Sequence, residues 1–207
     1  MDKLKNEKIL KHFIKIDLEI HKVILTVNFD EWLESDSKKL TNNELFLNVC
    51  RTIIGQQLSG KAANTIYGRF LKLFKGKEIT SANLLKIKDQ KIRDAGISWA
   101  KIKYIKDLAQ KYMNGEINLE SLYDMTNEEV ITELIKVKGI GNWTAEMVLI
   151  FTLNREDVFS FGDLGLKKGF EKVYGIKNPT QKQIEKMISK WTPYKSFGSI
   201  ALWHSLE

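Results

Sequence analysis

Two glycines and a distant aspartate are the residues in this sequence whose spacing could support chemistry on a phosphate-bearing ligand. Gly139 and Gly141 interrupt a helical apolar pattern, and a second helix is expected to begin near Asn142. Glycine permits a tight turn and a close approach of the backbone to a ligand. The unpaired N–H groups that open a helix bind phosphate oxygens. Asp163 follows in an apolar, glycine-flanked segment and could place one carboxylate near that ligand.

The elements that position these residues are predicted to be helices. The prolines, Pro179 and Pro193, both come late, and long stretches without proline carry apolar residues at three- and four-residue spacing. Strand patterns are scarce, so we expect an all-α protein. The predicted helices span residues 6–26, 43–54, 59–74, 81–86, 89–94, 99–112, 118–123, 127–136, 142–153, 164–173, 180–190 and 195–205.

Composition and charge limit the possible functions. The 207 residues, 43% of them hydrophobic, suffice for one core or two small lobes. A net charge of +7 favours an anionic partner, most commonly nucleic acid, although it also serves solubility alone. A single cysteine, Cys50, excludes an internal disulfide, a four-Cys zinc site and a four-Cys iron–sulfur cluster. The charged N-terminus and the lack of an apolar run of ~18 residues predict a soluble, intracellular protein with no membrane partner.

The pattern around the glycines is longer than the glycines alone. It reads Leu134-x-x-Val137-Lys138-Gly139-Ile140-Gly141-x-Trp143-Thr144-Ala145. This pattern resembles the helix–hairpin–helix of DNA repair glycosylases, whereas a shorter one would indicate a packing turn. An aspartate before an apolar helix is usually an N-cap. At this distance after the hairpin, Asp163 resembles the invariant aspartate of the helix–hairpin–helix glycosylase (HhH-GPD) superfamily.

Three further segments share the resemblance. Residues 53–63 look like the loop and helix that carry the residue filling the gap left by a flipped base. Residues 95–109 look like a second DNA-facing helix. Residues 191–203 look like the closing helix of the 3-methyladenine-DNA glycosylase II (AlkA-like) branch. One departure is local, because Ser160 and Phe161 stand where members often carry a proline after the Val-Phe pair.

The resemblance implies a compact two-lobed helical fold with the active site in the cleft between the lobes and no N-terminal β-domain. Residues 1–207 would form a single catalytic domain. One lobe would span about residues 45–155 and contain the hairpin, and the other would combine residues 1–44 with residues 156–207.

The resemblance also implies a reaction. Asp163 would be the catalytic carboxylate, which stabilises an oxocarbenium-like sugar and orients water. Strand-cutting members carry a lysine nucleophile where this chain has Trp143, and an indole cannot form a Schiff base. The expected activity is therefore a monofunctional hydrolase of alkylated bases. Asp157 could be a second carboxylate, but we interpret it as a surface or loop-capping residue.

Contacts with damaged double-stranded DNA and with the base are assigned by the same resemblance. Trp143, Met147 and Trp203 would line the substrate pocket, and Gln57 or Leu58 would be the wedge. Gln56 is interpreted instead as an amide that hydrogen-bonds the fold. Other tryptophans, Trp32 and Trp99, are interpreted as packing or rim residues. The predicted DNA-binding residues are Gln57, Leu58, Ser59, Lys138, Gly139, Gly141 and Thr144.

The family's hairpin binds a monovalent cation, K⁺ or Na⁺, through backbone carbonyls that correspond here to Ile135, Val137 and Ile140. No cofactor would be required for catalysis, and no iron–sulfur cluster is expected. We expect a monomer in the cytoplasm, associated with the nucleoid if the source is prokaryotic. Alternative functions are a glycosylase for uracil, hypoxanthine or oxidised bases, a non-catalytic helix–hairpin–helix DNA-binding protein, or a helical protein-interaction module.

Overall fold

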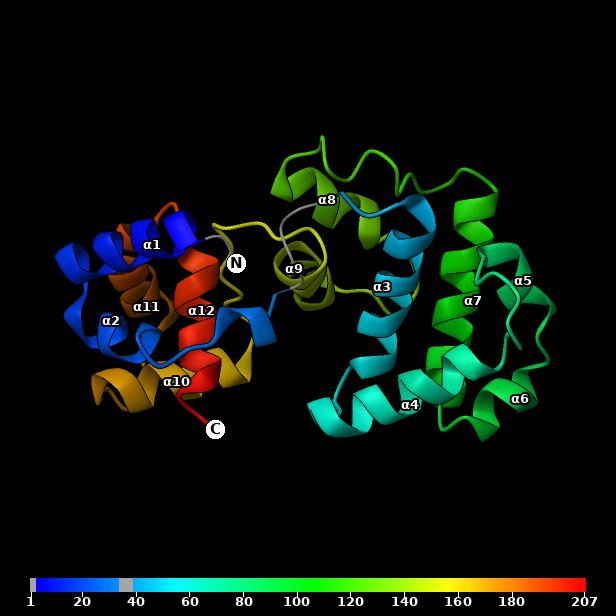
Figure 1. Cartoon of the computed structure of the whole chain (residues 1–207), viewed down its shortest axis with the longest axis horizontal. Helices are drawn as coiled ribbons and strands as arrows, with labels where there is room; N and C mark the ends of the chain where they lie inside the picture. Colours follow the sequence, from blue (N-terminus) through cyan, green and yellow to red (C-terminus); the bar gives the residue numbers. More distant parts are fainter. Residues whose placement is uncertain (1–2, 34–38) are drawn as a thin grey trace. The chain divides into compact units, whose positions relative to one another are not determined.

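The computed structural model describes residues 3–33 and 39–207, and these ranges contain helices, turns and loops but no β-strand (Figure 1). The expectation of an all-α protein is confirmed. The chain divides into two compact units. The terminal unit comprises residues 1–38 and 154–207, and the central unit comprises residues 39–153. No helix in the described part of the chain is both long and apolar enough to cross a membrane.

The central unit is built around α3, which packs against α4, α7 and α9. Helix α5 lies along α7, and α8 packs on α9 (Figure 1). The helices of this unit are α3 (Asn42–Gly55), α4 (Gly60–Lys72), α5 (Ser81–Lys86), α6 (Asp89–Asp94), α7 (Trp99–Met113), α8 (Asn127–Leu134) and α9 (Asn142–Phe151).

The sequence of α3 explains its central place. A capping box formed by Thr41 and Glu44 starts the helix. Its buried residues recur at the spacing of one helical face, and they are Leu45, Phe46, Val49, Cys50, Ile53 and Ile54. Burial raises the pKa of the Cys50 thiol, so this cysteine is a small core residue and no nucleophile.

The terminal unit is built around α12, against which α2 and α10 pack. Gly169 of α10 makes this contact close, because a Cβ added there would lie 2.4 Å from the carbonyl oxygen of Leu202 in α12. The helices of this unit are α1 (Lys3–Ile16), α2 (Leu18–Ile24), the 3₁₀ turn η1 (Phe29–Glu31), α10 (Leu164–Tyr174), α11 (Gln181–Ile188), the 3₁₀ turn η2 (Ser189–Trp191) and α12 (Lys195–His204).

The helix predicted over residues 6–26 is wrong in one respect, because the chain breaks into α1 and α2 at Asp17. Asp17 has extended backbone angles, and its side chain accepts from Ile20 N–H as the N-cap of α2. Its second oxygen accepts from the Tyr174 hydroxyl at 2.8 Å and from the buried Trp191 indole at 3.0 Å. Contacts from distant residues therefore decide where this helix is interrupted.

The helix predicted over residues 118–123 is also wrong, since this segment forms turns. The side chain of Asn118 accepts from the backbone N–H groups of Glu120 and Ser121, and the N–H of Asn118 donates to Glu133. An asparagine side chain that takes these donors competes with a helix. The helices predicted over residues 81–86 and 89–94 occur with those limits, and the remaining ones occur with ends shifted by a few residues. The 3₁₀ turn η2 replaces the last turn predicted over 180–190.

Candidate functional site

The glycine-containing turn lies between α8 and α9 in the central unit. Gly139 has a φ of +80°, and a Cβ added there would lie 2.1 Å from the ring of Tyr104 on α7. The turn is closed by backbone hydrogen bonds from Val137 N–H to Leu134 O and from Ile140 N–H to Val137 O. Glycine is therefore required at this position both by the left-handed backbone and by the aromatic ring against it.

Asp107 of α7 holds the same turn from the side. Its carboxylate accepts from the backbone N–H of Lys138 at 2.8 Å and lies 3.7 Å from the Lys138 ammonium. Lys111 pairs with Asp107 and also donates to the carbonyl of Lys136. The Lys138 side chain is 73% exposed, so it remains able to meet a ligand despite this neighbouring carboxylate.

The start of α9 has no side-chain cap. Gly141 is its N-cap residue and offers no side-chain acceptor, and both Gly141 and Asn142 are exposed. Most of the other helices of the central unit begin with a serine or threonine that accepts a backbone N–H. The first amides of α9, with the positive end of the helix dipole, therefore suit an anionic ligand.

A loop between α3 and α4 is tied to the hairpin by Gln56. Its side-chain amide donates to the carbonyl of Gly139 and to the hydroxyl of Thr144, both at 2.9 Å. The interpretation of Gln56 as an amide that hydrogen-bonds the fold is confirmed. Lys101 of α7 donates to the carbonyls of Ile54 and Gln56, and burial lowers the pKa of its ammonium. Two long-range anchors thus fix this loop.

The next residues of the loop present their side chains to solvent. Gln57 has a φ of +58° and is exposed, and Leu58 is 38% exposed. Ser59 caps α4 by accepting from Ala62 N–H. The two residues predicted as the wedge therefore lie at the tip of a loop whose base is held rigidly.

The central unit also contains three of the predicted residues of α9. Thr144 and Met147 are buried, and Trp143 is partly buried. Because the Thr144 hydroxyl accepts from Gln56, its side chain joins the hairpin to the loop. Thr144 is 3% exposed, so the backbone amide in the first turn of α9 is the donor we expect a phosphate to meet at this residue.

Asp163 is the N-cap of α10 in the terminal unit. Its Oδ1 accepts from the backbone N–H of Leu166 at 2.7 Å and from the indole N–H of Trp203 at 3.0 Å. Gly165 makes room for this arrangement, since a Cβ there would lie 3.0 Å from both the Asp163 oxygen and the Trp203 ring. Capping the helix and presenting a carboxylate are thus two properties of the same side chain.

Trp203 is stacked against Trp32, with ring centroids 6.4 Å apart and planes inclined by 9°. Trp32 follows η1, which is attached to α12 through an edge contact between Phe29 and Phe197. Sequence reasoning assigned Trp32 to packing or to the rim. No local pattern pairs Trp32 with a tryptophan 171 positions away, so its stacking on Trp203 is visible only in the folded chain.

The second acidic residue near this segment, Asp157, is engaged by the start of α12. Its carboxylate accepts from the Thr192 hydroxyl and from the backbone N–H of Lys195, and it pairs with the Lys195 ammonium at 3.1 Å. These contacts confirm the interpretation of Asp157 as a loop-capping residue. Of Asp157 and Asp163, it is Asp163 whose carboxylate accepts from an aromatic side chain, the indole of Trp203.

The predicted residues are grouped by unit. The central unit contains Gln57, Leu58, Ser59, Lys138, Gly139, Gly141, Trp143, Thr144 and Met147, and the terminal unit contains Asp163 and Trp203. Of the carbonyls predicted to bind a cation, that of Val137 accepts from Ile140 N–H, and Ile135 is the C-cap of α8.

Comparison with known proteins gives a consistent result. The family described as HhH-GPD superfamily base excision DNA repair protein matches residues 50–194. DNA-3-methyladenine glycosylase 1 of Schizosaccharomyces pombe is 32% identical over 81% of this chain and 75% of its own length. A putative DNA-3-methyladenine glycosylase of Bacillus subtilis is 28% identical over 97% of this chain and 69% of its own length. The solved structure of a Schizosaccharomyces pombe 3-methyladenine DNA glycosylase in complex with abasic DNA matches with a TM-score of 0.80 and 30% identity, covering 95% of each chain.

Proposed function

Because the chain belongs to the HhH-GPD superfamily of base excision DNA repair proteins, we propose that it is a monofunctional DNA glycosylase that removes alkylated bases of the 3-methyladenine type. The observation that carries the proposal is the fixed carboxylate of Asp163, held at the start of α10 by Leu166 and Trp203. Relatives named DNA-3-methyladenine glycosylase support the choice of base.

The proposed substrate is damaged double-stranded DNA, and its reactive bond lies inside the base stack. The damaged nucleotide must therefore rotate out of the duplex, at a cost of a few kcal/mol. Gln57 and Leu58 are the side chains proposed to fill the gap. Support comes from their exposed position on a loop anchored by Gln56 and Lys101, because a wedge needs a rigid base.

The hairpin is proposed to hold a phosphate of the DNA backbone. Amides at Gly139, Gly141 and Thr144 would bind its oxygens, with charge from Lys138 and a further contact at Ser59. Such main-chain contacts position DNA without reading its sequence. The exposed, uncapped start of α9 supports this assignment.

A monovalent cation, K⁺ or Na⁺, is proposed to sit beside that phosphate. Carbonyls of Ile135, Val137 and Ile140 would hold it, at the C-terminal end of α8, where helix carbonyls carry partial negative charge. The carbonyl of Val137 accepts one hydrogen bond and has a second lone pair for a cation. The ion would neutralise phosphate charge and take no part in bond cleavage.

Bond cleavage is proposed to depend on Asp163. As the base leaves, positive charge develops on the sugar, and a carboxylate stabilises it and orients the attacking water. Two N–H donors on Oδ1 fix the direction of that carboxylate before the reaction begins. An alkylated purine is already cationic and a good leaving group, so one carboxylate suffices.

The base itself is proposed to contact Trp203, Trp143 and Met147. Electron-rich rings favour a cationic base over an uncharged one. Trp143 replaces the lysine nucleophile of strand-cutting relatives, so water is the nucleophile and an abasic site is the product. We further propose a monomer that acts in the cytoplasm, at the nucleoid if the source is prokaryotic.

The test is base release from methylated duplex DNA, with the products separated by chromatography. We expect release of 3-methyladenine and an abasic strand that is cut only after hot alkali. Release of uracil from a uracil-containing duplex, with no release of 3-methyladenine from the methylated duplex, would refute the proposed base. Trapping of a protein–DNA adduct by borohydride would refute the monofunctional mechanism.

A further inference from the structure

One part of the central unit carries a large excess of positive charge. Residues 69–106 contain eleven lysines and arginines and three acidic residues, a net charge of +8. The whole chain carries +7, so the charges of the remaining residues sum to −1. This segment runs from the end of α4 through α5 and α6 into α7. The DNA contacts proposed above lie outside this segment, in the loop before α4 and in the hairpin between α8 and α9.

A hollow of about 330 Å³ lies within this segment, between the end of α4 and the helices α5 and α6. Leu73, Phe74 and Ile87 are the apolar residues that line it. The charged residues that line it are Lys75, Lys77, Lys86, Lys88 and Lys91.

The five lysines of the hollow are exposed, and no ion pair joins any of them to an acid among residues 3–33 and 39–207. The nearby acids have other partners. Asp89 pairs with Lys106, and Glu78 accepts from Asn43 at 2.6 Å. Five like charges around one hollow repel each other, so a polyanion in the hollow would relieve that repulsion.

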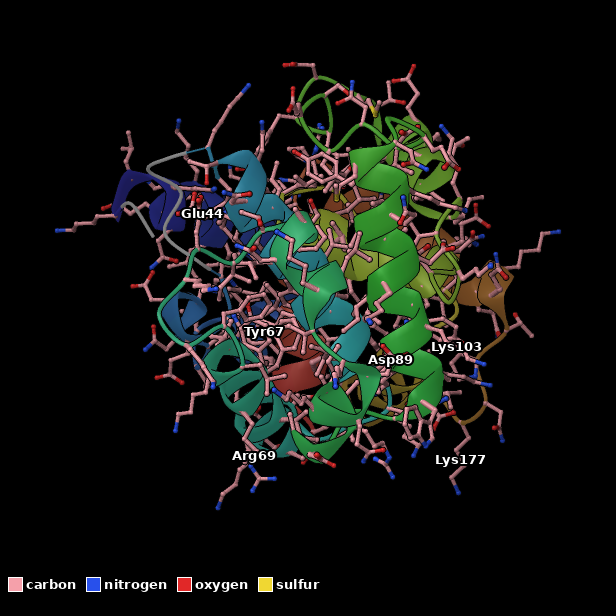
Figure 2. All side chains as sticks on the ribbon, turned by 90° about the vertical axis from the view of Figure 1, so that its right-hand side faces the viewer. Glu44, Tyr67, Arg69, Asp89, Lys103 and Lys177 are labelled. Carbon is pink, nitrogen blue, oxygen red and sulfur yellow. The ribbon has the colours of Figure 1, made fainter. Side chains whose placement is uncertain are left out.

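The hollow is connected to the wedge loop by one face of α4. Lys61, Thr65, Arg69 and Lys72 follow each other at spacings of four, four and three residues, which places them on one side of the helix. All four are exposed, and Arg69 points away from the ribbon in Figure 2. We call this row and the five lysines of the hollow the basic track.

The basic track begins beside Ser59, the N-cap of α4, and ends at the hollow. Thirteen residues of α-helix span ~20 Å, which equals about six base-pair steps of ~3.4 Å. A duplex engaged at the wedge loop can therefore extend its backbone along the track to the hollow.

We propose that the basic track binds the phosphate backbone of the DNA duplex on one side of the damaged nucleotide, about six base pairs from it. The proposal rests on the function proposed above and extends its DNA contact. Continuity with the wedge loop favours duplex DNA over an acidic protein segment. Its energy is electrostatic, because each neutralised phosphate releases counterions.

The test compares duplexes of about 9 and about 25 base pairs, each with a central abasic-site analogue, by fluorescence anisotropy across a range of KCl concentrations. The variant is Lys86→Glu/Lys88→Glu/Lys91→Glu. Its matched control is Lys177→Glu/Lys182→Glu/Lys186→Glu, which makes the same charge change at exposed lysines of the terminal unit. Lys177 is labelled in Figure 2.

We expect the track variant to weaken binding of the longer duplex at least tenfold and to change the short duplex by less than about twofold. The slope of log affinity against log salt should become shallower by up to about 2.7 for the longer duplex, about 0.9 for each lost phosphate contact. The control should retain the slope. The neutral variant with glutamine at the same three positions should change in the same direction by a smaller factor.

Equal weakening on both duplexes, or none on the longer one, would overturn the proposal. A second outcome would also overturn it: the wild type binds poly-L-glutamate, and the track variant loses that binding but still binds the longer duplex normally. The partner would then be an acidic protein segment. If wild type releases no base from methylated DNA, the proposed function fails, whereas the comparison of duplex lengths still decides the role of the track.

Discussion

Replacing Gly139 with alanine tests whether the hairpin turn depends on its contact with α7. The backbone there has a φ of +80°, and an added Cβ would lie 2.1 Å from the ring of Tyr104. Gly115 is a matched control, because its φ is +72° and no heavy atom lies within 4 Å of an added Cβ. Left-handed backbone costs an alanine roughly 1–2 kcal/mol at either position. Displacing the ring adds roughly 1–3 kcal/mol at Gly139 alone.

The assay is urea denaturation monitored by circular dichroism. The free energies of unfolding are compared between variants that show the same dependence of unfolding free energy on urea concentration. We expect Gly139→Ala to lose about 2–5 kcal/mol and Gly115→Ala about 1–2 kcal/mol. In a Tyr104→Ala background, Gly139→Ala should cost only as much as Gly115→Ala, because the ring is gone. Equal losses for the two glycine variants in the presence of Tyr104 would refute the reasoning.

Three other predictions concern the carboxylate site, helix packing and acid stability. Trp203→Phe keeps an aromatic ring but removes the N–H that donates to Asp163. Single-turnover base release should therefore fall about tenfold, while the affinity for abasic DNA stays the same. An unchanged rate would contradict the role of the N–H. Gly169→Ala places a Cβ 2.4 Å from the carbonyl oxygen of Leu202. The free energy of unfolding of this variant should be lower than that of wild type by roughly 1–3 kcal/mol or more. A stabilised variant would contradict the close packing. Hydrogen bonds at the N-cap lower the pKa of Glu129, so its contribution to stability is present above its ordinary pKa of 4.5 and is lost as pH falls through the lowered value. Glu129→Gln should therefore melt below wild type at neutral pH and approach it in acid, and a constant difference in melting temperature would contradict this.

Elements with clear local signals could be predicted from the sequence. Residues 81–86 and 89–94 form helices with the predicted limits, and α7 begins at Trp99 as expected because Ser98 caps it. The hairpin turn was identifiable because Gly139 and its neighbours form a long pattern. These features depend on residues that are close in sequence, where capping and periodicity act.

Features fixed by distant residues could not be predicted. The break at Asp17 depends on Tyr174 and Trp191, which are more than 150 positions away. The stack of Trp32 on Trp203 has no counterpart in any local pattern. Sequence patterns report the preferences of a segment, whereas the site also depends on which segments the core brings together.

The loop before α4 shows the same limit in the central unit. The sequence predicts the amide role of Gln56, but no local pattern identifies its partners on the hairpin or the anchor from Lys101. Lys101 belongs to residues 95–109, which the resemblance assigns to a DNA-facing helix, yet its ammonium donates to carbonyls of the loop. Burial of a lysine is a tertiary property, and charge in a sequence does not reveal it.

The central claim is that the carboxylate of Asp163 stabilises charge as the base leaves. Asp163→Asn tests it most directly, because asparagine is as good an N-cap as aspartate and keeps an oxygen for Leu166 N–H and the Trp203 indole. Single-turnover release of 3-methyladenine from methylated duplex DNA should fall by roughly 10²–10³-fold, with abasic-DNA binding and melting temperature preserved. Release at the wild-type rate by a folded, DNA-binding Asp163→Asn variant would contradict the account.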